Sequence, residues 1–240
     1  MQSCRPFERG SNMFKNILIF LFCSTLFASP EDDIIIIDNF VSNEISSALI
    51  RHHKSENEDL KRNSYNTVSF NYSSPPKIQK IARRISKRIL NEMKKHYGIS
   101  KELLHVTHAL IFARTIGNIC PYHSDNIKYV CPIHGDNPPT IRKKCSESCM
   151  GSFEPNHTPF YDYTAVLYLN EDFEGGEIVL EDGPFNKIYR KKIPIKKNRL
   201  VLFPNGPEYY HEVLRITEGT RYNVLFWYTN DPNYTHRVLK

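Results

Sequence analysis

Apolar positions follow a helical period before Leu103 and a strand period after it. Residues 77–97 carry apolar side chains every three or four positions, which predicts an amphipathic helix with a basic outer face. A shorter helix is expected after Ser42, and the isoleucine run at 34–37 predicts a buried strand ahead of it. The polar segment 56–74 is expected to be a loop.

The second half of the chain consists of short segments with strand-like character, separated by turn residues such as glycine and asparagine. Candidate strands lie at 104–116, 162–170, 176–182, 187–195, 199–204, 210–216 and 220–229. Two helices followed by many short strands predict an α+β fold, with a β-sandwich or a jelly roll (double-stranded β-helix) flanked by N-terminal helices. A chain of 240 residues with 40% hydrophobic content can build one such core.

The first 28 residues predict a secretory signal peptide, because basic residues precede an apolar run from Ile17 to Phe27 and small residues follow it. The run is shorter than the ~20 residues of a membrane span, although retention as a signal anchor stays open. Contact with a membrane is expected only in that case. The expected divisions are a signal segment at 1–28, a strand and supporting helices at 29–103, the jelly roll at 104–232 with an insertion at 127–160, and a tail at 233–240.

Three N-x-S/T sequons, at Asn71, Asn156 and Asn233, agree with secretion, so we expect the endoplasmic reticulum lumen or the outside of the cell. Without residues 1–28 the chain keeps four cysteines, and an even number in an oxidising compartment predicts two disulfides. These candidates are Cys120, Cys131, Cys145 and Cys149.

The charge balance argues against a nucleic acid partner. The whole chain carries a formal net charge of +6. Removal of residues 1–28 takes away three basic residues and one acidic residue, which leaves 29 basic and 25 acidic residues and a net charge of +4. That excess is too small to indicate a polyanionic partner.

A possible metal site begins with His123 and Asp125, in the stretch CPYHSDN. If this stretch is a strand, side chains two residues apart leave the same face and can converge on one ion. His211, 86 residues after Asp125 and at the start of a predicted strand, is the best third ligand. Two histidines and one carboxylate form a facial triad that leaves open positions on an octahedral Fe(II).

A possible anion site follows ten residues after His211, at Arg221. Strand alternation places Arg221 on the same face as Asn223, Leu225 and Trp227, a face with apolar members. A buried arginine is costly without an anion, and its planar guanidinium suits a carboxylate.

The H-x-D motif, the distal histidine and the arginine ten residues later resemble the iron- and 2-oxoglutarate-dependent dioxygenases of the prolyl and lysyl hydroxylase superfamily. Within it, the tracts HSDN, YDYTAVLYLNEDFEGGE and HEVLRITEGTRYNVLFWYTNDP are most similar to the catalytic domain of the prolyl 3-hydroxylases. The resemblance spans about residues 104–232, and DIIIIDNFVSNE is similar to the segment that opens many such domains. The tract YHEVLRITEGTRY is also similar to the end of lysyl hydroxylases.

This resemblance implies that His123, Asp125 and His211 hold Fe(II), and that Arg221 holds the C5 carboxylate of 2-oxoglutarate. Tyr163 or Thr220 would add a hydroxyl to that carboxylate. Dioxygen is implied as the second cosubstrate and ascorbate as a reductant. The implied reaction is hydroxylation of a protein or peptide side chain, most often proline in a collagen-like or proline-rich segment, with a lysyl or prolyl 4-hydroxylase-like activity as the alternative.

Two alternatives stay open from the residues. Cys131-x2-His134 and Cys145-x3-Cys149 also have zinc-ligand spacing, although a secretory compartment favours disulfides and similar insertions of the prolyl 3-hydroxylases contain cysteines too. The insertion is a candidate substrate lid. A noncatalytic jelly roll that binds a metal or a peptide is the rival class of function. Such a module has no need of Arg221, so binding of 2-oxoglutarate discriminates between the two.

Overall fold

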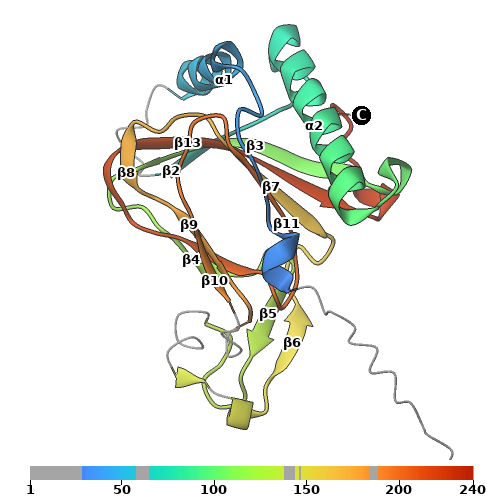
Figure 1. Cartoon of the computed structure of the whole chain (residues 1–240), viewed down its shortest axis with the longest axis vertical. Helices are drawn as coiled ribbons and strands as arrows, with labels where there is room; N and C mark the ends of the chain where they lie inside the picture. Colours follow the sequence, from blue (N-terminus) through green and yellow to red (C-terminus); the bar gives the residue numbers. More distant parts are fainter. Residues whose placement is uncertain (1–28, 58–64, 138–143, 146, 184–188, 240) are drawn as a thin grey trace, which may run out of the picture.

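A computed structural model of the chain describes residues 29–57, 65–137, 144–145, 147–183 and 189–239 (Figure 1). The predicted signal segment at 1–28 lies outside the described residues. Within the described ranges, no helix combines the length and the apolar character that crossing a bilayer requires.

The described residues form two long helices near the N-terminus and antiparallel strands, most of which follow the helices. The helices are α1 (Asn43–Glu56) and α2 (Pro76–Tyr97). The strands are β1 (Ile35–Ile37), β2 (Tyr65–Ser69), β3 (His105–Thr115), β4 (Cys120–His123), β5 (Ile127–Val130), β6 (Ser152–Pro155), β7 (Tyr163–Tyr168), β8 (Phe173–Gly175), β9 (Ile178–Glu181), β10 (Arg190–Ile193), β11 (Leu200–Pro204), β12 (Tyr210–Val213) and β13 (Ile216–Thr229).

The strands form two facing sheets and a separate ribbon. The large sheet has the order β1-β11-β7-β13-β3-β2, with β8 paired to the start of β13, and the small sheet has the order β10-β9-β12-β4. Strands β5 and β6 pair only with each other, and Figure 1 shows this ribbon extending below the small sheet. The jelly-roll core flanked by N-terminal helices, predicted from the sequence, is confirmed.

Both helices cover the outer face of the large sheet (Figure 1). Helix α2 forms where the period predicted it, and it ends at Gly98, whose left-handed φ of 67° suits glycine. Its buried side chains are Ile78, Ala82, Ile85, Ser86, Ile89 and Met93. They join a cluster with the outward side chains of β7 and β13, among them Leu167 and Phe226.

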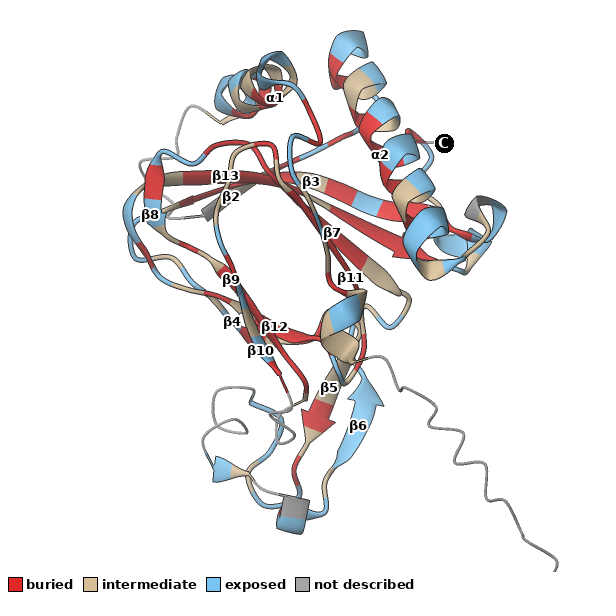
Figure 2. Ribbon diagram, viewed as in Figure 1, coloured by how far each residue is buried: buried red, intermediate tan, exposed pale blue. Residues whose placement is uncertain are grey.

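The opposite face of the large sheet packs against the small sheet. Val166 and Tyr168 of β7 and Phe203 of β11 meet Ile178 and Leu180 of β9 in a second buried cluster. Strand alternation therefore divides β7 and β13 into a helix-facing set and a set that faces the interior between the sheets. Figure 2 shows that β7 and the later part of β13 are largely buried.

Two expectations about the N-terminal region need correction. The segment 56–74, expected to be a loop, contains strand β2, which pairs with β3 in the register Val68↔Ile111. The isoleucine run forms β1 at the edge of the large sheet rather than a fully buried strand, and Ile36 is 37% exposed. An edge strand has a partner on one side only, which leaves part of it open to solvent.

Candidate active site

The strand pairing of the small sheet brings three predicted ligands together. His123 at the end of β4 and His211 on β12 are directly opposite each other in the antiparallel register, with ring centroids 4.4 Å apart. Asp125 lies two residues beyond the end of β4, so the two side chains converge without sharing a strand. One ligand atom from each of the three residues lies within 4.8 Å of the other two.

Both imidazole rings are oriented by backbone carbonyls. Nδ1 of His123 lies 2.6 Å from the carbonyl oxygen of Pro121, and Nδ1 of His211 lies 3.1 Å from that of Tyr209. A carbonyl accepts only a proton, so each Nδ1 carries the hydrogen and each Nε2 keeps its lone pair. The two Nε2 atoms point to Asp125 Oδ1, at 3.4 and 3.8 Å. This is the second-sphere arrangement that prepares histidines for a metal.

The other oxygen of Asp125 is held by the large sheet. Thr164 Oγ1 donates to Oδ2 at 2.5 Å, and the indole Nε1 of Trp227 donates to it at 3.0 Å. Thr164 and Trp227 are cross-strand partners on β7 and β13, so the sheet register sets both donors at once. One carboxylate oxygen is thereby fixed, while the other remains directed at the histidines.

Charge coupling inside this group sets the protonation of each ligand. Burial raises the pKa of Asp125, but the two imidazoles and the Thr164 hydroxyl outweigh it and hold that pKa well below its usual range. Burial and the neighbouring His123 lower the pKa of His211 to about 4. Burial acts in the same direction on His123, but Asp125 and Cys120 outweigh it and raise the pKa of His123. The site therefore offers a carboxylate and two imidazoles, and because metal ligands must be deprotonated, metal binding at this site is expected to depend on pH.

Arg221 lines the same cavity, which has a volume of about 100 Å³, several times what one buried water occupies. Arg221 is 1% exposed, and no carboxylate of the described residues forms an ion pair with its guanidinium. Arg114 lies directly opposite on β3 and lines the cavity too. Two guanidinium groups side by side repel each other, so an anion in the cavity would be stabilised.

Several donors around Arg221 have no hydrogen-bond partner among the described residues. Nη1 donates to Asn223 Oδ1 at 2.8 Å, but Arg221 Nε, Asn223 Nδ2 and Tyr168 Oη are buried and without a partner. The guanidinium carbon lies 5.0 Å from the centre of the Tyr168 ring. A Cβ on Gly176 would come within 3.1 Å of Arg221 Cδ, so this glycine lets the chain pass close to the arginine. Unpaired buried donors are costly, and a bound carboxylate would satisfy them.

Comparison with known proteins agrees with this arrangement. Residues 117–229 match the model of the 2OG-Fe(II) oxygenase superfamily. The chain is 41% identical over 81 residues to human prolyl 3-hydroxylase 2, a match that covers 34% of this chain and 11% of the relative. The chain thus matches about a tenth of the length of that curated relative.

Two solved structures share the fold. A viral collagen prolyl hydroxylase from Paramecium Bursaria Chlorella virus-1, solved as a 2OG complex, has a TM-score of 0.54 and 18% identity, and the match covers 82% of this chain and 95% of that one. A prolyl hydroxylase from Trichoplax adhaerens, in complex with a hypoxia inducible factor peptide, has a TM-score of 0.57 and 17% identity, with 83% and 84% covered. Residues 117–229 form a 2OG-Fe(II) oxygenase domain.

The residues of this oxygenase domain fit the groups that its family implies, which are Fe(II), 2-oxoglutarate and dioxygen. The two Nε2 atoms and Asp125 Oδ1 are the donor types of a facial triad. The unpaired donors around Arg221 suit the far carboxylate of a keto dicarboxylic acid. Both features line one cavity.

Two predicted residues do not lie in this cavity. Tyr163 stacks on Tyr97 of α2, with ring centroids 5.4 Å apart, on the helix-facing side of β7. Thr220 precedes Arg221 on β13 and so points to the other face, and Asn170 Nδ2 donates to its backbone carbonyl at 2.8 Å. The tyrosine whose ring lies beside the guanidinium is instead Tyr168.

Sequence reasoning missed several residues of the oxygenase site. Thr164 and Trp227 hold Asp125, and Tyr168 and Arg114 flank Arg221. Strand alternation places Trp227 on the same face as Arg221, but alternation alone does not assign its indole a hydrogen-bond partner. An available signal was the alternation of β7, since Thr164, Val166 and Tyr168 share one face.

The four predicted disulfide cysteines are free thiols in the structure, which corrects that expectation. Cys120 lies beside the metal ligands, with its sulfur 3.9 Å from His123 Nδ1, and lines the cavity. Cys131, Cys145 and Cys149 lie in the insertion. Because Cys120 is in the cavity and the others surround a histidine, the four do not form two pairs.

Of the three predicted glycosylation sites, Asn71 and Asn233 are exposed. Asn156 is half-buried, and its amide nitrogen, the atom to which a glycan would be attached, donates to the carbonyl of Ser124 at 3.2 Å. In the folded chain Asn156 therefore has a structural role beside Asp125.

Proposed function

We propose that this chain is an Fe(II)- and 2-oxoglutarate-dependent dioxygenase that hydroxylates a prolyl side chain of a protein or peptide. The observation that carries the proposal is that one cavity contains a two-histidine, one-carboxylate cluster and a buried guanidinium that has no counter-ion among the described residues. The similarity to a prolyl 3-hydroxylase supports proline as the residue and C3 as the position.

His123, Asp125 and His211 would hold the iron through two imidazole nitrogens and one carboxylate oxygen. When bound, Fe(II) supplies the activation of dioxygen, which is coupled to decarboxylation of 2-oxoglutarate to succinate and CO2 and to insertion of oxygen into a C–H bond. Thr164 and Trp227 keep Asp125 from rotating, because both donate to its second oxygen. Ascorbate is the proposed reductant for iron that becomes oxidised.

Arg221 would bind the far carboxylate of 2-oxoglutarate, with Tyr168 and Asn223 supplying further donors. Such charge-assisted hydrogen bonds contribute about 1.5–3 kcal/mol each. The interior position of Arg221 excludes water from this contact, which strengthens the electrostatic attraction.

The lining of the cavity favours proline over lysine as the substrate residue. Among the described residues that line it are two arginines, Arg114 and Arg221, and one carboxylate, Asp125, which is a proposed metal ligand. A lysine ammonium would therefore find no free anion among these described residues. Beside Asp125, Phe112, Tyr161 and Trp227 form a buried apolar cluster, a surface that suits a neutral ring.

The proposed compartment is the secretory pathway, either the endoplasmic reticulum lumen or the outside of the cell. The signal-like segment and the exposed sequons at Asn71 and Asn233 support it. The insertion after Asp125 is the proposed substrate lid, because its C-terminal end contacts the site. There Thr158 Oγ1 donates to the backbone carbonyl of Asp125 at 2.6 Å.

The test is turnover with a proline-rich peptide. Succinate release is measured with and without Fe(II), 2-oxoglutarate and peptide, and the peptide is searched by mass spectrometry for the gain of one oxygen. Hydrolysis and comparison with 3-hydroxyproline and 4-hydroxyproline standards identifies the ring position. We expect product only in the complete mixture.

His211→Ala should abolish turnover, while His96→Ala, which removes an exposed histidine of α2, should leave it unchanged. Full turnover by folded His211→Ala would refute the ligand assignment. A noncatalytic binding module is distinguished by anaerobic titration with 2-oxoglutarate: the iron-loaded enzyme should develop a visible charge-transfer band. Its absence in folded, iron-loaded protein would favour the binding module.

A further inference from the structure

The insertion between β4 and β7 has too little apolar core to be stable by burial alone. Strand β6 is exposed at every residue, as Figure 2 shows. The buried cluster of the insertion consists of Tyr129, Cys131 and Cys149, with Cys145 partly buried against it. Structural units of this size normally need a disulfide or a metal in place of a hydrophobic core.

The turn that follows β5 is shaped around a sulfur atom. Cys131 and Gly135 exchange two backbone hydrogen bonds, of 2.9 and 2.8 Å, which close a tight loop. Within it the backbone N–H of His134 donates to Cys131 Sγ at 3.3 Å. Gly135 has a φ of 76°, a value that favours glycine. An N–H directed at a sulfur stabilises the thiolate, the form that binds metals.

Three sulfurs converge on one imidazole nitrogen. The Sγ atoms of Cys131, Cys145 and Cys149 lie 3.3, 3.2 and 3.9 Å from His134 Nδ1. All four ligand atoms lie within 4.8 Å of one another. In a tetrahedral zinc site, bonds of about 2.3 Å to sulfur and 2.0–2.1 Å to nitrogen separate sulfur from nitrogen by about 3.5 Å. The observed separations bracket that value.

We propose that Cys131, His134, Cys145 and Cys149 bind one Zn²⁺ as a structural site, separate from the iron ligands. The four side chains complete a tetrahedron and leave no position for substrate, which is the pattern of a structural zinc rather than a catalytic one. A disulfide would engage two of the sulfurs and leave the third buried against His134 without a partner.

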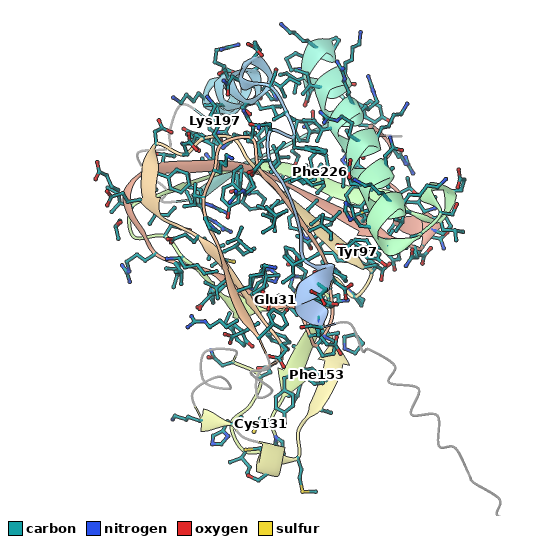
Figure 3. The ribbon with its side chains drawn as sticks, viewed as in Figure 1. Glu31, Tyr97, Cys131, Phe153, Lys197 and Phe226 are labelled. Carbon is teal, nitrogen blue, oxygen red and sulfur yellow. The ribbon has the colours of Figure 1, made fainter. Side chains whose placement is uncertain are left out.

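The zinc would brace a ribbon that rests on the oxygenase site. The Tyr129 ring lies 5.3 Å from that of Phe153, which lies 6.3 Å from the ring of Tyr210. Tyr210 immediately precedes His211, and its ring lies 5.0 Å from that of Tyr122, which precedes His123. Figure 3 shows Phe153 on the ribbon between the cluster at Cys131 and the barrel.

The first experiment measures metal in the purified full-length chain and the absorption of the Co²⁺-substituted chain. We expect a single tightly held zinc and a sulfur-to-cobalt charge-transfer band. Cys145→Ser and Cys149→Ser should each lower retained zinc about tenfold or more and remove the band. Cys120→Ser, the same substitution outside the cluster, and His211→Ala, which damages the iron site, should leave both signals in place.

A second experiment keeps the inference testable if the serine variants fold poorly. His134→Cys preserves a tetrahedral set and should retain zinc, whereas His134→Ala should lose it. Intact mass under non-reducing conditions then shows whether the thiols are paired. A disulfide among Cys131, Cys145 and Cys149, or zinc that is lost equally from Cys120→Ser, would overturn the proposal. None of these measurements requires turnover, so failure of the proposed function leaves them unaffected.

Discussion

Trp227 offers the sharpest test of how the protein holds its metal ligand. Its indole Nε1 donates to Asp125 Oδ2 at 3.0 Å, on the side of the carboxylate away from the histidines. Trp227→Phe keeps an aromatic ring against Phe112 and Tyr161 and removes only this donor and part of the ring. Asp125 then keeps Thr164 as its remaining donor on that oxygen.

The expected effect follows from the charge of the acceptor. A hydrogen bond to an ionised, buried carboxylate contributes about 1.5–3 kcal/mol, which corresponds to about a 10- to 140-fold change in an equilibrium constant. Removal of a residue that orients a metal ligand typically weakens metal binding about 10- to 100-fold. We therefore expect the dissociation constant for Fe(II) to rise by that factor in Trp227→Phe, with little change in the affinity for 2-oxoglutarate once iron is saturating.

The assay is an anaerobic equilibrium titration with Fe(II), repeated with Mn²⁺ and followed by paramagnetic resonance of the free ion. Trp227 is the one tryptophan of the chain, so its fluorescence also reports metal binding in the parent protein. Tyr161→Phe is the matched control, because its hydroxyl binds His108 rather than Asp125 although its ring stacks on Trp227. Equal iron affinity in Trp227→Phe, Tyr161→Phe and the parent would refute the reasoning.

Three further predictions concern the anion site, acid stability and a glycine. Arg221→Lys loses the planar fork and should raise the KM for 2-oxoglutarate about 10- to 100-fold at unchanged iron affinity; an unchanged KM in steady-state kinetics would contradict the anion site. Burial lowers the folded-state pKa of His53 below 6.5. The contribution of the neutral imidazole to the free energy of unfolding is therefore complete above pH 6.5 and is lost as the pH falls through the folded-state pKa. His53→Gln should therefore show a shallower loss of urea-unfolding free energy between pH 7.5 and 5 than the parent, and an equal slope would exclude His53 as a source. Gly175→Ala places a Cβ 2.0 Å from the carbonyl oxygen of Arg215 at a φ of 72° and should cost more than about 2 kcal/mol, whereas Gly98→Ala, at a φ of 67° in open space, should cost about 1 kcal/mol. Equal melting temperatures for Gly175→Ala and Gly98→Ala would show that the clash with the Arg215 carbonyl does not destabilise the fold.

The sequence predicted the helices and the later strands because each has a strong local period. Helix α2 has one continuous apolar face, and its ends carry their own signals, a proline at the start and Gly98 at the end. Strand β2 was missed because YNTVS has little apolar character of its own, and its extended state depends on pairing with β3. Tertiary pairing of this kind is not visible in a local window.

The ligands and Arg221 were predicted because their spacing matches a chemical pattern, but the residues that hold them were not. Alternation states that Tyr163 and Thr164 point to opposite faces, but it does not say which face is interior. That choice depends on the packing of Leu167 against the helices. The cysteines show the same limit, since two short motifs do not reveal that their turns meet around one histidine.

The two N-terminal helices and the anion site are connected through β13. Tyr222, Val224 and Phe226 face the helices and are buried in the outer cluster, so they fix which face of β13 is outward. Arg221 and Asn223 must then point between the sheets, toward the small sheet that carries the histidines. A one-residue shift of β13 would expose Phe226 to the polar cavity and turn the guanidinium into the apolar layer, and both changes are costly. The apolar layer that packs against α1 and α2 therefore also directs Arg221 into the space between the sheets. The proposed cosubstrate would be held there from the large sheet, opposite the histidines of the small sheet.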